Sequence, residues 1–150
     1  MKKIRILIIN NEVMIEDEII SFETAKLAKE KRCYIDGCCR VFHKCYLVPK
    51  GEEPIKYTSL VPNSGLWNWK EYPEESYIIA YTQTTLARYL REKHYLSVEV
   101  FYNVVVDKFI DAVINIKHGD GRPYVVWDRS YYGTYEEAMD ASLQIALNMI

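Results

Sequence analysis

The residues best suited to chemistry are metal-ligand types gathered between positions 33 and 45. All four cysteines and one histidine fall there: Cys33, Cys38, Cys39, His43 and Cys45. Thiolates and an imidazole are the usual ligands of tetrahedral zinc. The spacing contains no C-x₂-C knuckle, however, and strand neighbours two residues apart need a turn to converge on one ion. We therefore predict reduced thiols without metal, and keep a zinc site at Cys33, Cys39, His43 and Cys45 as the alternative.

A second group of residues could stack on a flat ligand. Trp67, Trp69 and Tyr72 lie in a long segment of turn-forming and polar residues, between Tyr57 and Tyr77. Irregular segments of this length are usually functional or disordered, and three large aromatic residues argue against disorder. They predict a platform for a base, a nucleotide or a partner's side chain. The alternative is a loop that folds over an open sheet face.

Two basic segments could contribute to the same site. Lysines and arginines gather over residues 26–32 and again over residues 88–94, near the ends of two expected helices. The two ends could bind an anion jointly if they are adjacent; otherwise they complement the negative ends of the helix dipoles. The predicted ligand or partner site therefore comprises Trp67, Trp69, Tyr72, Tyr57, Arg88 and Arg91.

Catalytic motifs do not stand out in this sequence. We find no G-x-S-x-G elbow, no glycine-rich phosphate loop and no metal-binding carboxylate motif, and the three histidines have no obvious nucleophile beside them. We predict a protein that is not an enzyme and that needs no cofactor.

Length and charge narrow the class of protein. The 150 residues predict a single domain over 1–150. The net charge of −2 and the pI near 5.9 argue against nucleic acid and anionic membranes as partners. The apolar run Ile6 to Ile9 is too short for a signal peptide, and no run approaches the roughly 20 residues of a membrane span. We expect a cytoplasmic protein.

The elements that must position these residues follow from periodicity and capping signals. Helices are expected from Ser21 to about residue 31, from Thr82 or Thr84 to His94, and from Thr134 onward. Strands are expected over 38–48, 55–60, 77–81, 96–106, 109–116 and 124–128. The fold class is α+β, with a mainly antiparallel sheet (a hairpin plus a three-stranded meander) packed against about three helices. One core should contain Leu86, Leu90, Val100, Val104, Ile114, Ile145, Ala146 and Met149.

Three helical segments carry a resemblance to known proteins. Residues 21–31 (SFETAKLAKEK), 82–94 (TQTTLARYLREKH) and 135–147 (YEEAMDASLQIAL) resemble segments of small uncharacterised proteins of Bacteroidetes phages and mobile elements. The resemblance implies a phage or mobile-element origin and brings no known activity. It also implies that residues 1–13 are an extension of the domain. That pattern has glycine after the first helix and asparagine after the histidine. This chain has Arg32 and Tyr95 there, so we expect different helix ends.

These observations favour a binding protein. Our first hypothesis is contact with another protein, of the host or the phage, through an exposed sheet edge and the aromatic loop; inhibition of a host defence component is one such role. The second hypothesis is capture of a small nucleotide-like molecule by the aromatic residues and the helix-end arginines. Residues 4–9, which all have apolar or long side chains, also need burial, so we expect residues 1–10 to form a strand that contributes to a homodimer.

Overall fold

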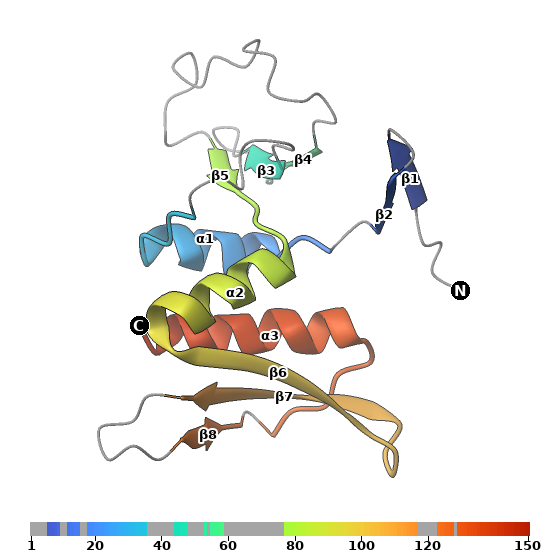
Figure 1. The fold of residues 1–150 in the computed structure, drawn as a ribbon, viewed down its shortest axis with the longest axis vertical. Coiled ribbons are helices and arrows are strands. Elements are labelled where there is room, and N and C mark those ends of the chain that lie inside the picture. The colour runs from blue at the N-terminus through green and yellow to red at the C-terminus, as the bar shows by residue number, and fades with distance from the viewer. Residues whose placement is uncertain are drawn as a thin grey trace.

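The computed structural model describes residues 6–9, 12–15, 18–35, 44–47, 53, 55–58, 77–116, 123–127 and 129–150. In this part of the chain three helices lie between two of the three small sheets (Figure 1). The fold is α+β, as the sequence predicted. The elements are β1 (Ile6–Ile9), β2 (Glu12–Ile15), α1 (Phe22–Glu30), β3 (Lys44–Leu47), β4 (Ile55–Thr58), β5 (Tyr77–Ile79), α2 (Gln83–His94), β6 (Leu96–Asn103), β7 (Lys108–Asn115), β8 (Tyr124–Val126) and α3 (Tyr135–Asn148).

The strands form three antiparallel sheets. The expected hairpin is β3 with β4, and β5 pairs with the other side of β3, in the order β4-β3-β5. The expected meander is the sheet β6-β7-β8. At the N-terminus, Ile6–Ile9 is a strand, but it pairs with β2 in a hairpin of its own. Residues 12–15 form β2, and residues 18–20 lead into α1.

Each helix begins where a side-chain oxygen accepts a backbone N–H. The Ser21 hydroxyl accepts from the Thr24 N–H, and the Thr82 hydroxyl accepts from the Thr85 N–H. At α3, Thr134 and Glu137 form a reciprocal capping box. Such caps satisfy amides that have no partner inside the helix. The three starts lie within one residue of the predicted positions.

The ends of α1 and α2 use the left-handed conformation. Arg32 has φ 55° and Tyr95 has φ 58°. These two residues stand where the pattern has glycine and asparagine, and they adopt the conformation that glycine and asparagine favour. Around Arg32, the amides of residues 32 and 33 donate to the carbonyls of Lys29 and Ala28, which is a Schellman motif. The helices therefore end at a residue in this conformation despite the unfavourable residue types.

Arg32→Gly should raise the free energy of unfolding by about 0.5–1 kcal/mol, because glycine adopts positive φ without the steric cost of a Cβ. Arg32 is exposed, so little packing is lost with its side chain. The measurement is urea unfolding followed by far-ultraviolet circular dichroism. The matched control is Glu30→Gly, inside the last turn of α1, which should cost about 1 kcal/mol. Equal losses in both variants would contradict the assigned conformation.

The three helices run in the same direction. Figure 1 shows their N-termini at one end of the molecule and their C-termini at the other, beside the chain terminus marked C. At the second end, the Lys31 ammonium donates to the main-chain oxygen of Ile150 at 2.6 Å, which ties the end of α1 to the end of α3. At the first end, Ser21, Gln83 and Glu136 line one common cleft. The parallel arrangement therefore separates two chemically different ends.

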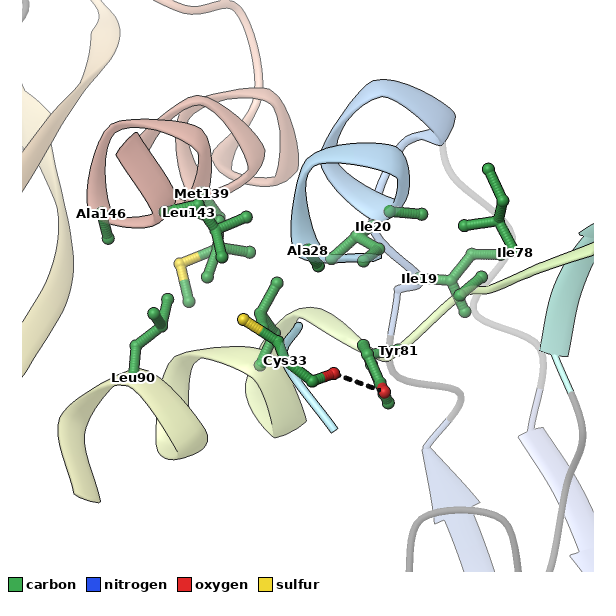
Figure 2. Close-up of a cluster of buried hydrophobic side chains, with 14 of the residues drawn as sticks. Ile19, Ile20, Ala28, Cys33, Ile78, Tyr81, Leu90, Met139, Leu143 and Ala146 are labelled. Atoms are coloured by element: carbon green, nitrogen blue, oxygen red, sulfur yellow. Dashed lines mark hydrogen bonds between the residues drawn. The ribbon is translucent and has the colours of Figure 1, made fainter. Parts of the chain in front are cut away.

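The hydrophobic core lies between the helices and continues onto the sheets β4-β3-β5 and β6-β7-β8. Figure 2 shows Leu90 of α2 pointing toward Met139 and Leu143 of α3, while Ile19, Ile20 and Ile78 lie beside α1. The Tyr81 hydroxyl donates to the Cys33 carbonyl at 2.8 Å (Figure 2). Among the predicted core residues, Leu86, Leu90 and Ala146 are fully buried, and Val100, Ile145 and Met149 pack against the core.

Two predicted core residues are placed wrongly. Val104 is 79% exposed, because β6 ends at Asn103 and a turn follows. Ile114 lies on the sheet face that points away from the helices. The register pairs Val98 with Val113, so Val113 faces the core and its neighbour Ile114 does not. Alternation identified the two faces of β7 correctly but did not tell which of them the helices cover.

Candidate protein-interaction site

A turn of exposed valines joins β6 to β7. We call residues Val104, Val105, Val106 and Asp107 the valine turn. Val104 is 79% exposed and Val105 is 89% exposed, whereas β-branched residues are usually found in half-buried strands. Figure 1 shows the turn projecting beyond the end of the sheet. The molecule thus presents three consecutive aliphatic side chains to solvent.

Polar side chains on either side hold the valine turn in one conformation. The Asn103 side-chain oxygen accepts the Val105 N–H at 3.0 Å. Asp107 has φ 55°, which aspartate tolerates better than most residues, and its carboxylate accepts a hydrogen bond from the Tyr102 hydroxyl. This hydrogen bond raises the pKa of Tyr102. A turn ordered before binding has less conformational entropy to lose when it meets a partner.

Aromatic rings connect the base of the valine turn to α3. The rings of Tyr102 and Phe109 are 5.2 Å apart, and those of Phe109 and Tyr135 are 6.2 Å apart with an interplanar angle of 88°. Phe109 and Tyr132 exchange two backbone hydrogen bonds, of 3.0 and 2.9 Å. About half of the Tyr102 and Tyr135 side chains stays exposed. The turn therefore rests on a rigid aromatic support that begins at the first residue of α3.

An acidic cleft lies at the N-terminal end of the three helices. Its volume is about 520 Å³, within the range of small-molecule sites. Four carboxyl-bearing residues belong to its lining: Glu18, Glu136, Glu137 and Asp140. Carboxylates in this place complement the positive ends of the helix dipoles. They also repel phosphate, so this cleft does not suit the nucleotide-like ligand of the second hypothesis.

Asp140 has a structural role in this cleft. Its carboxylate accepts from the Ser21 N–H at 2.9 Å, from the Thr24 hydroxyl at 2.8 Å and from the Gln144 amide at 3.1 Å. One side chain of α3 thus caps the N-terminus of α1 and fixes the two helices together. Its oxygens are occupied by these contacts, which leaves Asp140 poorly placed for general acid or base chemistry.

Tyr46 reaches the same region from β3. Its hydroxyl is buried and donates to the Ile20 carbonyl at 2.7 Å. Burial raises the pKa of this phenol, and the nearby charges of Asp140, Glu23 and Glu18 raise it further. Tyr46 therefore stays neutral and acts as a hydrogen-bond donor that ties β3 to the segment before α1.

The predicted binding site stays a prediction, because half of its residues lie outside the part of the chain that the structure describes. Trp67, Trp69 and Tyr72 lie outside the described residues. Tyr57 belongs to β4. Arg88 and Arg91 are exposed on α2. Figure 1 shows the C-terminal ends of α1 and α2 at the same end of the molecule, which is the arrangement that joint anion binding requires.

The cysteine cluster is placed only in part. Cys39 and His43 lie outside the described residues, and Cys45 belongs to β3. Cys33 is buried in the core, where burial raises the pKa of its thiol. Within the described ranges, no three histidine, cysteine or acidic side chains converge on a point where a metal ion could bind. A buried, protonated thiol packs as a small apolar side chain.

Sequence reasoning missed the exposure of the valine turn. The run Val104 to Val106 continues the alternation of β6, so it was counted as strand and core. The signal that could have found it is its polar flanks, because Asn103 and Asp107 are residues that favour turns. Their spacing encloses three residues, which is short for a strand and typical of a hairpin connection.

The valine turn is an exposed apolar surface, of the kind that a protein partner can cover. None of the helices that the structure describes is long and apolar enough to cross a bilayer. Comparisons with protein-family models, with curated protein sequences and with solved structures give no significant match for this chain.

Proposed function

We propose that this protein acts without catalysis, by binding another protein through the valine turn. The observation that carries the proposal is the exposure of Val104 and Val105 at a turn that Asn103 and Asp107 hold in place. Exposed apolar residues on a rigid support are typical of interaction sites, since burying them releases free energy and little order must be gained. Full burial of two valines is worth about 3 kcal/mol, or more than 100-fold in affinity.

The charges near the turn indicate the chemistry of the partner. Tyr135, at the base of the turn, is followed by Glu136 and Glu137. Asp107 belongs to the turn itself and Lys108 follows it, so three acidic residues stand against one basic residue. Carboxylates beside an apolar knob favour a pocket that is apolar inside and basic at its rim. They disfavour the anionic surface of a membrane. The partner class that fits is therefore a protein with such a pocket.

The biological role in this proposal rests on the resemblance to proteins of Bacteroidetes phages and mobile elements. A protein of that origin acts inside a host cell, in the cytoplasm, where inhibition of a defence component by direct contact is one suitable role. The valine turn supports a contact of this kind, because occlusion of a pocket needs only a complementary knob. The experiment below would show whether the partner is a host protein or a phage protein.

The test is affinity capture from a Bacteroidetes lysate with quantitative mass spectrometry. The wild type and the matched control Arg88→Ala/Arg91→Ala should enrich the same protein. Val104→Ser/Val105→Ser should lose it, and titration with the purified partner should show binding at least tenfold weaker. Retention of the partner by the serine variant would refute the proposal. Loss in the arginine variant alone would transfer the site to the basic helix ends.

A further inference from the structure

The face of the β6-β7-β8 sheet that points away from the helices is apolar. The register places Phe101 opposite Ile110, Glu99 opposite Ala112, and Ile114 opposite Val125 on this face. Trp127 follows β8 on the same side, because its ring lies 6.1 Å from that of Phe101. We call this surface the outer sheet face. Its members are Ser97, Glu99, Phe101, Asn103, Lys108, Ile110, Ala112, Ile114, Val125 and Trp127.

The centre of the outer sheet face resembles the core of an interface. Phe101 belongs to β6 and Trp127 directly follows β8, and their rings approach each other across β7, which lies between those strands. Between those strands, Ala112 has no exposed surface, although it faces away from the helices. Phe101 stays 46% exposed and Trp127 stays 51% exposed. Large half-buried aromatic rings around a small residue are typical of surfaces that a partner completes.

An antiparallel sheet with one face in water normally carries polar residues on that face. Here the central positions are apolar, and three of the four polar residues (Ser97, Asn103 and Lys108) lie at strand ends. In the part of the chain that the structure describes, the helices that pack on this sheet are α2 and α3, and both cover the opposite face. The outer sheet face therefore has an apolar centre and a polar rim, the usual anatomy of an interface.

We infer that a second copy of this chain covers the outer sheet face, so that the protein is a homodimer. From strand spacing and rise, the face measures about 27 Å along β6 and β7 and about 14 Å across, as large as the largest apolar patch of a typical monomer. These dimensions enclose roughly 380 Å² with the polar strand ends included, about half of the roughly 800 Å² per partner of a standard interface, so we expect a weak dimer that forms at micromolar concentration. Two such sheets pack face to face about 10 Å apart, as in a β-sandwich.

The charges of the outer sheet face fit a two-fold pairing. Glu99 and Lys108 are its charged members, and the register separates them by four residues along the strand direction. A two-fold interface brings the same patch together with itself, so each residue needs its complement on the same surface. Two sheets that pack with their strands antiparallel can place Glu99 of each copy beside Lys108 of the other. A face with one acid and one base is thus self-complementary.

The experiment is analytical ultracentrifugation of the full chain between about 1 and 50 μM, with circular dichroism to verify folding. The wild type should shift from monomer to dimer across this range. Phe101→Ser/Trp127→Ser should weaken dimerisation at least 100-fold, and Val104→Ser/Val105→Ser should leave it unchanged. A monomeric wild type at 50 μM overturns the inference. So does a dimer that survives the Phe101/Trp127 change but dissociates when residues 1–13 are deleted, since the N-terminal segment would then hold it.

Charge exchange gives a second measurement that does not remove core side chains. Glu99→Lys and Lys108→Glu should each weaken the dimer about tenfold, because like charges then meet across the two-fold axis. The double variant should return to within a factor of about three of the wild type. A double variant as weak as the single variants overturns the two-fold pairing, even where the serine variant fails to fold.

Discussion

Leu90→Ala is expected to lower the free energy of unfolding by about 2–5 kcal/mol. Leu90 has no exposed surface and points from α2 toward Met139 and Leu143 of α3 (Figure 2). Truncation removes apolar burial and leaves a cavity that the α2–α3 interface fills only in part. Because α2 and α3 also form the helical side of the β6-β7-β8 sheet, the loss should be near the upper half of that range.

The measurement for Leu90→Ala is urea unfolding at neutral pH, with equal slopes for both proteins as a check on two-state behaviour. The matched control is Arg88→Ala, an exposed position two residues earlier on the same helix, which should change stability by less than about 0.5 kcal/mol. A loss below that value for Leu90→Ala would mean that the buried face of α2 is assigned wrongly.

The second large effect is expected for Asp140→Ala, at about 3 kcal/mol. This carboxylate accepts hydrogen bonds from the Ser21 N–H and from the hydroxyl of Thr24, a residue with no exposed surface. Hydrogen bonds to a charged group contribute about 1.5–3 kcal/mol, and their loss leaves a buried hydroxyl with fewer partners. The N-terminus of α1 also loses the negative charge that complements its dipole.

Thermal and urea unfolding of three variants would test the role of Asp140. Asp140→Asn keeps one acceptor oxygen and should lose about half as much stability as Asp140→Ala. Asn148→Ala serves as the control, because Asn148 is exposed and its side chain donates to the Gln144 carbonyl of the same helix at 3.0 Å. If Asp140→Ala and Asn148→Ala lose equal stability, Asp140 does not join the two helices in solution.

The parts of the fold that could be predicted are those that nearby residues determine. Ser21, Thr82 and the pair Thr134–Glu137 mark the helix starts by their own hydrogen bonds, so the signal is contained in four consecutive residues. The meander β6-β7-β8 was predictable for a similar reason, because each of its strands alternates or is rich in β-branched residues. Local propensity and final structure agree at these positions.

The rest depends on contacts that local patterns do not contain. Both faces of β7 carry apolar residues, so only the packing of α3 decides that Val113 is covered and Ile114 is not. The hydrogen bonds of Asp140 join residues 119 and 116 positions apart, which no spacing rule connects. The candidate site has the same origin: Phe101 and Trp127 meet only after β6 and β8 have paired with β7.

The parallel helices have a consequence for how partners approach. Acidic residues gather at the N-terminal end and basic residues at the C-terminal end, among them Lys31, Arg91 and Lys93. α3 alone, with 14 residues, separates the two ends by about 21 Å, more than twice the screening length of about 8 Å at physiological ionic strength. In dilute salt a charged partner would therefore be rotated as it arrives, and its association rate would rise steeply. In the cell each end would attract its own counterpart, independently of the other.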